Sequence, residues 1–198
     1  MHVVQAGVGW VEVISGPMFS GKTEELVRRL RRARIARQTV QVFKPRIDDR
    51  YDATSIVSHS ANAMEATVVD YVEHLARLVD QDAKVVGIDE VQFLDRGVVD
   101  LIQRLADHGV RVICAGLDQD YTGKPFDPMP ELLAVAEYIT KTLAICMRCG
   151  APASRSQRMV PSGDRVVVGA AKSYEARCRR CHVPRAEATT GELFQDAD

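Results

Sequence analysis

The sequence lacks any apolar run of about 18 residues, the length that a membrane-spanning helix requires, so a helical membrane protein is excluded. It also lacks internal repeats and Gly/Ser-rich linkers. No basic segment precedes an apolar stretch at the N-terminus, so we expect no signal peptide and a cytoplasmic location. Five cysteines are too few for a disulfide-rich scaffold. A formal net charge of -1 lacks the basic excess of a dedicated nucleic-acid binder, so we expect neither nucleic acid nor a membrane as partner.

The composition that is present is typical of a globular protein. Hydrophobic residues make up 46% and charged residues 27% of 198 residues, enough for one domain, or one domain plus a small appendage. The charges are unevenly spread, because residues 22–50 contain ten Lys and Arg against four Asp and Glu. We interpret the arginines of residues 28–37 as a solvated or interface-facing helix side. The local basic excess also suggests that a small polyanion is handled nearby.

Short β-branched runs alternate with segments of helical hydrophobic spacing. The runs predict buried parallel strands, and the segments between them predict helices. The predicted strands are 11–14, 39–43, 85–89 and 110–115, and the predicted helices are 23–37, 70–79 and 97–108. The alternation predicts an α/β domain over residues 1–140, with a mostly parallel sheet flanked by helices. The pattern then changes, which predicts a small β-rich subdomain at 141–191 and a frayed tail at 192–198.

A phosphate-binding loop is predicted directly after the first strand. Residues 16–23, GPMFSGKT, match G-x-x-x-x-G-K-[S/T] between a predicted strand and a predicted helix. Backbone N–H groups of such a loop surround a phosphate, the lysine reaches its outer oxygens, and the last hydroxyl binds Mg²⁺. The fold class is therefore α/β of the P-loop (RecA-like) type. The candidate ATP-binding residues of the loop are Gly16, Pro17, Met18, Phe19, Ser20, Gly21, Lys22 and Thr23.

A pair of acids ends the third predicted strand, where α/β sheets place their ligands. Asp89 suits the Mg²⁺ that accompanies ATP, and Glu90 is placed to accept a proton from an attacking hydroxyl. Gln92 joins Asp89 among the candidate ATP- and magnesium-binding residues. The guanine-recognition pattern N-K-x-D is absent, which favours ATP over GTP.

Four of the cysteines form two C-x-x-C pairs, Cys146 with Cys149 and Cys178 with Cys181, separated by 28 residues. Four thiolates at such spacings can close a tetrahedral structural Zn²⁺ site, here in a zinc-ribbon-like β subdomain. The spacer exceeds the usual length of about 15–20 residues, which implies an inserted loop. Redox chemistry of the C-x-x-C pairs is the alternative, and His182 is a spare candidate ligand or a surface histidine. The fifth, Cys114, is predicted to be packed in a strand.

Several segments, taken in order, resemble the cytosolic thymidine kinases of the type found in animals and many bacteria. The similarity runs from about residue 9 to about residue 190, nearly the whole chain. The matching segments are GPMFSGKTEEL at 16–26, DDRY at 48–51, SHSANAMEA at 58–66, DEVQF at 89–93, GLD at 116–118, KPF at 124–126, CMRC at 146–149, and Tyr174 before CRRC at 178–181. Because all of them occur in order, the resemblance is specific.

The resemblance implies a P-loop domain joined to a zinc-held subdomain, whose lasso loop closes over the thymine ring. Residues 166–174 match that loop, with Ala170 where a second glycine is usual and Ser156 where threonine is frequent. The implied substrate-binding residues are Met18, Phe93, Leu117, Phe126, Ser156, Val167, Gly169 and Tyr174. The family also implies a homotetramer and feedback inhibition by thymidine triphosphate.

The implied reaction moves the γ-phosphoryl group of ATP to the 5′-hydroxyl of thymidine. Glu90 would accept the hydroxyl proton, while Lys22, Mg²⁺ and Arg50 stabilise the transferring charge. Three alternatives stay open on the sequence alone: a zinc-ribbon ATPase motor, a zinc-ribbon adaptor that is not an enzyme, and a kinase for another deoxynucleoside such as deoxyuridine.

Overall fold

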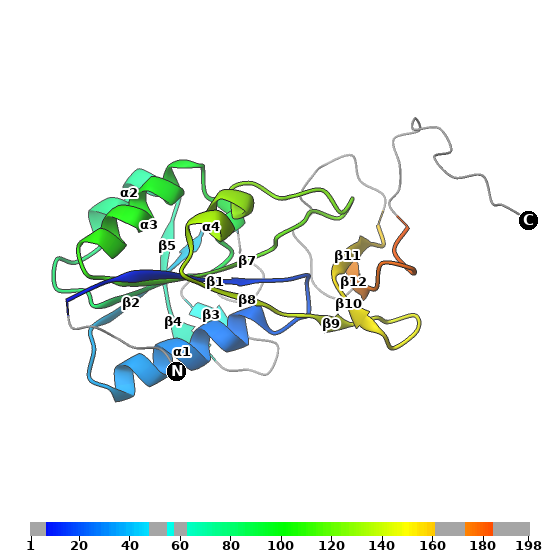
Figure 1. The fold of residues 1–198 in the computed structure, drawn as a ribbon, viewed down its shortest axis with the longest axis horizontal. Coiled ribbons are helices and arrows are strands. Elements are labelled where there is room, and N and C mark those ends of the chain that lie inside the picture. The colour runs from blue at the N-terminus through cyan, green and yellow to red at the C-terminus, as the bar shows by residue number, and fades with distance from the viewer. Residues whose placement is uncertain (1–6, 48–54, 58–62, 161–172, 184–198) are drawn as a thin grey trace, which may run out of the picture.

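A computed structural model describes residues 7–47, 55–57, 63–160 and 173–183 (Figure 1). The DDRY segment with Arg50, most of SHSANAMEA, and Val167, Gly169 and Ala170 of the lasso match lie outside the described residues. Within them, no helix has the length and apolar character needed to cross a membrane.

The main sheet has six parallel strands in the order β5-β2-β6-β7-β1-β8. The strands are β1 (Trp10–Ser15), β2 (Val40–Pro45), β5 (Thr67–Val69), β6 (Val85–Ile88), β7 (Arg111–Gly116) and β8 (Tyr138–Lys141). The four predicted strands are confirmed as β1, β2, β6 and β7, and they form the centre of the sheet. The two edge strands were not predicted, because β5 has three residues and β8 alternates half-buried with exposed positions.

Helices cover both faces of this sheet (Figure 1). They are α1 (Lys22–Ile35), α2 (Val72–Leu78), α3 (Gly97–Asp107) and α4 (Met129–Val135), with a 3-10 turn at Val91–Phe93. α1 packs against one face, and α2, α3 and α4 pack against the other, so two separate apolar clusters flank the sheet. The first three helices confirm the predicted ones. α4 was not predicted, because it has only seven residues and a proline in its first turn.

α1 illustrates why its sequence forms a one-sided helix. Leu26, Val27, Leu30 and Ala33 recur at helical spacing and are buried against the sheet. The arginines of residues 28–34 lie on the other side and are exposed, except for half-buried Arg29. The predicted solvated helix side is thus observed in the single chain.

Small antiparallel pairs make up the remaining described structure. The hairpin β3 (Ser55–Val57) with β4 (Ala63–Glu65) lies beside α1 in Figure 1, and its buried Ile56 and Met64 join the α1 cluster. After β8 come β9 (Ala144–Ile145) with β10 (Pro152–Ala153), and β11 (Arg155–Arg158) with β12 (Tyr174–Arg177). These four strands and the cysteines form a separate small core, which confirms the predicted β subdomain next to the sheet.

A carboxylate in the middle strand region ties α1 to three strands. Glu12 of β1 is 5% exposed and accepts hydrogen bonds from Arg29 of α1 and Arg111 of β7, each at 2.6 Å, and from the Trp10 indole at 2.7 Å. Arg29 also donates to the Thr140 hydroxyl of β8 at 2.8 Å. Burial acts to raise the pKa of Glu12, but the hydrogen bonds from Arg111 and Trp10 outweigh it and hold that pKa below its usual value.

Removing this carboxylate should destabilise the fold. We expect Glu12→Gln to lower the free energy of unfolding by about 3–5 kcal/mol at pH 7, because two largely buried guanidinium groups lose their counter-charge. A group with a depressed folded-state pKa contributes stability above its unfolded value of 4.5 and loses it as the pH falls. The difference between wild type and variant in denaturant unfolding should therefore shrink below about pH 4.5. The exposed Glu73→Gln is the control, with a change within about 0.5 kcal/mol, and an equal effect of both variants would contradict the role of Glu12.

Candidate active site

The predicted phosphate loop lies between β1 and α1, as its pattern requires. Gly16 and Gly21 have φ of 151° and 80°, and Phe19 is also left-handed at 64°. A Cβ at Gly16 would lie 2.4 Å from the Thr142 carbonyl oxygen, so only glycine fits at that position. The loop therefore depends on its first glycine for contact with the chain that leaves β8.

Side chains within the loop hold it in this conformation. Lys22 is 8% exposed, and its ammonium group donates to the Pro17 carbonyl oxygen at 2.8 Å. The Ser20 hydroxyl donates to the same carbonyl at 2.8 Å and lies 2.8 Å from the Thr142 hydroxyl. The lysine charge is thus held at the loop, beside the N-terminus of α1, where a phosphate would be attracted.

Both predicted acids lie against this loop. The Thr23 hydroxyl donates to Asp89 Oδ2 at 3.0 Å, and Asp89 Oδ1 accepts the backbone N–H of Glu90 at 3.0 Å. A hydroxyl and a carboxylate side by side are oxygen donors of the kind that Mg²⁺ prefers, so Thr23 and Asp89 fit the metal that accompanies ATP. Glu90 itself is 9% exposed and takes a left-handed φ of 49° directly after β6.

Gln92 lies in the 3-10 turn after these acids and is 3% exposed. Its Nε2 donates to Glu90 Oε2 at 2.5 Å, and its Oε1 accepts the backbone N–H of Leu117 at 3.1 Å. Its printed contacts are thus with the acid and with the end of β7, rather than with the phosphate loop where the sequence analysis expected it.

The predicted substrate residues are brought together in part. Phe93 and Phe126 meet edge to face, with ring centroids 6.0 Å apart, and the backbone N–H of Met18 donates to the Ser156 hydroxyl at 3.0 Å. The second contact joins the phosphate loop to β11, so the two candidate sites adjoin. Leu117, through its bond with Gln92, lies next to the acids.

Arg158 was missed by the sequence analysis. It is 4% exposed, its guanidinium stacks 3.7 Å above the Tyr121 ring, and it donates to the Tyr174 hydroxyl at 3.1 Å. Arg158 thereby fixes the one described tyrosine of the predicted substrate set. Nothing in the sequence distinguishes it from the other arginines of this arginine-rich subdomain.

The four paired cysteines converge in the small subdomain. Their sulfur atoms all lie within 4.8 Å of one another, and Cys149 Sγ lies 3.6 Å from Cys178 Sγ. A zinc–sulfur tetrahedron with bonds of about 2.3 Å has edges of about 3.8 Å, so the cluster fits a tetrahedral metal. The His182 ring lies outside this group of described ligands, 2.9 Å from the Tyr121 carbonyl oxygen.

The protonation chemistry of this cluster also points to a cation. Hydrogen bonding to Cys149, together with burial, raises the pKa of Cys181 to about 12. Burial alone would raise the pKa of Cys146, but backbone hydrogen bonds from Cys178 and Arg148 outweigh it and lower that pKa to about 6. Four adjacent thiolates repel one another, and a divalent cation removes that repulsion. Cys114, by contrast, is fully buried in β7, and burial raises its pKa to about 12, as expected for a packed strand residue.

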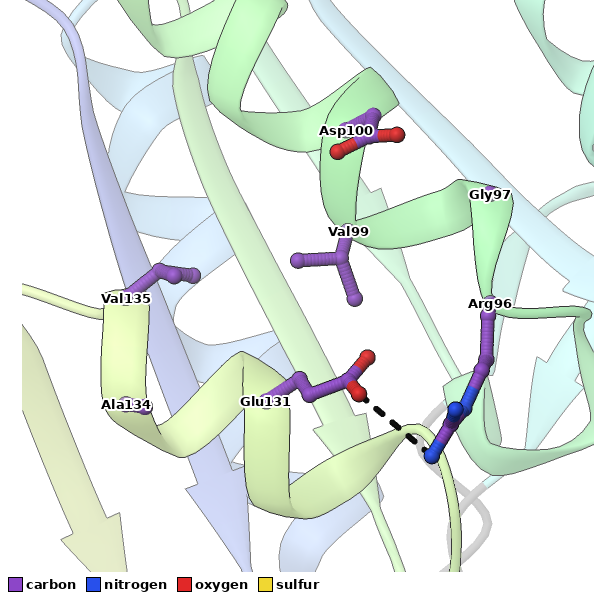
Figure 2. A pocket seen from close by; sticks show the side chains of 7 residues that line it. All are labelled: Arg96, Gly97, Val99, Asp100, Glu131, Ala134 and Val135. Atoms are coloured by element: carbon purple, nitrogen blue, oxygen red, sulfur yellow. Dashed lines mark ion pairs between the residues drawn. The ribbon is translucent and has the colours of Figure 1, made fainter.

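One hollow of about 400 Å³ lies between α3 and α4 (Figure 2). Val99 and Val135 form its apolar part, and the Arg96–Glu131 ion pair at 3.4 Å crosses it. It contains none of the predicted site residues.

Comparison with known proteins gives the family of this chain. The sequence model of the thymidine kinase family matches residues 9–182. The chain belongs to the thymidine kinase family. It is 60% identical over 186 residues to the thymidine kinase of Rhodothermus sp. (strain ITI 518), a match that covers 94% of this chain and 87% of that relative. Family membership makes the activity ATP-dependent phosphorylation of thymidine, and the motor and adaptor alternatives are set aside.

Proposed function

We propose that Glu90 is the general base of this thymidine phosphorylation and that residues 16–23 bind the phosphates of ATP. The observation that carries the proposal is the convergence of loop and acids, through the Thr23–Asp89 hydrogen bond, at one edge of the sheet. Glu90 directly follows Asp89, is nearly buried, and accepts a hydrogen bond from Gln92. A carboxylate held in this way can orient a 5′-hydroxyl and take its proton as the phosphoryl group transfers in line.

Charge on the transferring group needs positive partners. Lys22 is held at the loop and is free to exchange the Pro17 carbonyl for phosphate oxygens. Thr23 and Asp89 would hold the Mg²⁺ that neutralises the β- and γ-phosphate oxygens when ATP is bound. Arg50, which lies outside the described residues, stays a prediction for this role.

The nucleoside is proposed to lie between Phe93, Phe126, Leu117 and Met18, next to Ser156. The Phe93–Phe126 contact and the Met18–Ser156 hydrogen bond support this placement. Tyr174, held by Arg158, would stand at the start of β12, where the lasso enters the subdomain. Val167 and Gly169 stay predictions, as does the division at residues 140 and 191.

The metal of the subdomain is proposed to be a structural zinc. The donor set consists of four sulfurs and leaves no position for a substrate, and the spacing fits zinc. Such thiolates survive in a reducing compartment, which supports the proposed cytoplasmic location. Tetramer formation and feedback inhibition by thymidine triphosphate are proposed from the family resemblance.

The role of Glu90 is tested by Glu90→Gln, which keeps the shape but removes the base. We expect kcat to fall by roughly 10²–10⁴, with the Kd for ATP within about twofold of wild type. Phosphoryl transfer to thymidine and equilibrium ATP binding should be measured on the same preparation. Near-normal turnover would remove Glu90 from this role.

The zinc assignment is tested by Cys149→Ser, with Cys114→Ala as the matched control outside the cluster. Loss of one thiolate should release the metal and raise the KM for thymidine, because β11 and β12 lose their anchor. Metal content by atomic emission and KM should be measured for both variants. Unchanged zinc in the first variant, or equal loss in both, would contradict the four-thiolate site.

Base preference is tested with a panel of nucleosides and Mg-ATP, with single-stranded DNA as a separate condition. Monophosphate should form fastest from thymidine, because the thymine methyl group adds apolar contact in a pocket lined by two phenylalanines. Equal rates with deoxyuridine would show that the pocket does not select that methyl group. DNA-stimulated ATP hydrolysis without monophosphate would overturn the kinase mechanism.

A further inference from the structure

We propose that Gln92 is a positioning residue that acts through Glu90, and that Gly116 is the position that makes room for it. The inference rests on the proposed role of Glu90 as the base. It differs from a role for Gln92 in binding ATP or magnesium, because it assigns the effect of Gln92 to the carboxylate that receives the proton.

The first support is that the amide of Gln92 has its orientation fixed by the backbone. A backbone N–H can only donate, so the N–H of Leu117 requires the amide oxygen at 3.1 Å. The amide nitrogen must then face Glu90, where it donates at 2.5 Å. The side chain has no freedom to reverse without leaving a buried N–H and a buried carboxylate unsatisfied.

The second support is that Glu90 needs such a partner. Its backbone is held by the Asp89 carboxylate on its N–H and by the N–H of Phe93 on its carbonyl oxygen, both at 3.0 Å. These bonds fix the main chain in the left-handed region but leave the side-chain torsions unrestrained. The donated bond from Gln92 fixes one carboxylate oxygen and leaves the second, Oε1, to face a substrate hydroxyl. It also favours the ionised carboxylate, which is the form that accepts a proton.

The third support is the space at Gly116, the last residue of β7. A Cβ on Gly116 would lie 2.6 Å from Gln92 Oε1 and 3.0 Å from Met129 Sδ and Val91 Cγ1. Its φ lies outside the left-handed region, so packing rather than backbone strain requires glycine here. The end of β7 thus carries a space for the amide and, one residue later, the N–H that orients it.

The first experiment uses Gln92→Met, which keeps the volume and removes both hydrogen bonds. We expect kcat to fall by roughly 10–100-fold, because a small misplacement of a catalytic group has effects of this size. The KM for ATP should stay within about twofold of wild type. A rise in the KM for ATP with kcat preserved would instead assign Gln92 to nucleotide binding and overturn the inference.

The second experiment is a double-mutant cycle with Glu90→Gln. If Gln92 acts through the carboxylate, adding Gln92→Met to Glu90→Gln should lower kcat by less than about twofold further. Multiplicative effects would show an independent role and overturn the inference. A Glu90→Gln variant with near-normal turnover would defeat the proposed base itself, whereas a normal Gln92→Met beside a slow Glu90→Gln would defeat the positioning role alone.

The third experiment uses Gly116→Ala, whose Cβ displaces the amide without touching the substrates. We expect a kcat loss similar to that of Gln92→Met and a non-additive double variant. Gly87→Ala is the matched control, because its Cβ would lie 2.7 Å from Leu30 in the core, on the α1 face of the sheet. At a temperature where both variants are folded by circular dichroism, Gly87→Ala should keep wild-type kcat. Equal loss in both would show that the Gly116 effect is general destabilisation.

Discussion

The Thr23–Asp89 hydrogen bond is the contact on which the arrangement of the site depends. Thr23 begins α1 after β1, and Asp89 follows β6, while β7 lies between these two strands in the sheet. In a parallel sheet all carboxyl ends meet at one edge, so a side-chain contact can span the width of an intervening strand. The contact places a helix N-terminus, a lysine and two acids within one small region, although 66 residues separate the two partners.

The phosphate loop is also joined to the small subdomain, which has its own core. Met18 donates to Ser156, and Ser20 meets Thr142 just after β8. A change in the loop when phosphate binds must therefore alter contacts with the subdomain. By thermodynamic linkage, a nucleoside bound against Ser156 influences ATP affinity to the same degree as ATP influences nucleoside affinity.

Much of this arrangement was predictable from sequence, because its signals are local. The β-branched runs of β1, β2, β6 and β7 are buried on both faces, which a run of apolar residues records directly, and the P-loop and cysteine pairs have fixed spacings. The edge strands β5 and β8 and the helix α4 have short or mixed patterns, so only tertiary pairing defines them. The contacts of Gln92, Ser156 and Arg158 join segments far apart in the chain, and the sequence holds no record of such a pairing.

The ladder of β11 and β12 has a consequence for how this enzyme can vary. Arg158 pairs with Tyr174, and the Met159 N–H donates to the Ser173 carbonyl at 2.9 Å, so the intervening stretch begins and ends at one closed base. Once such a base exists, the entropy of closing the loop changes slowly with its length, by about 0.6 kcal/mol for each doubling. Insertions, deletions and substitutions in that stretch therefore carry little penalty for folding. Selectivity for the nucleobase can diverge between relatives while the scaffold and the phosphoryl-transfer chemistry stay unchanged.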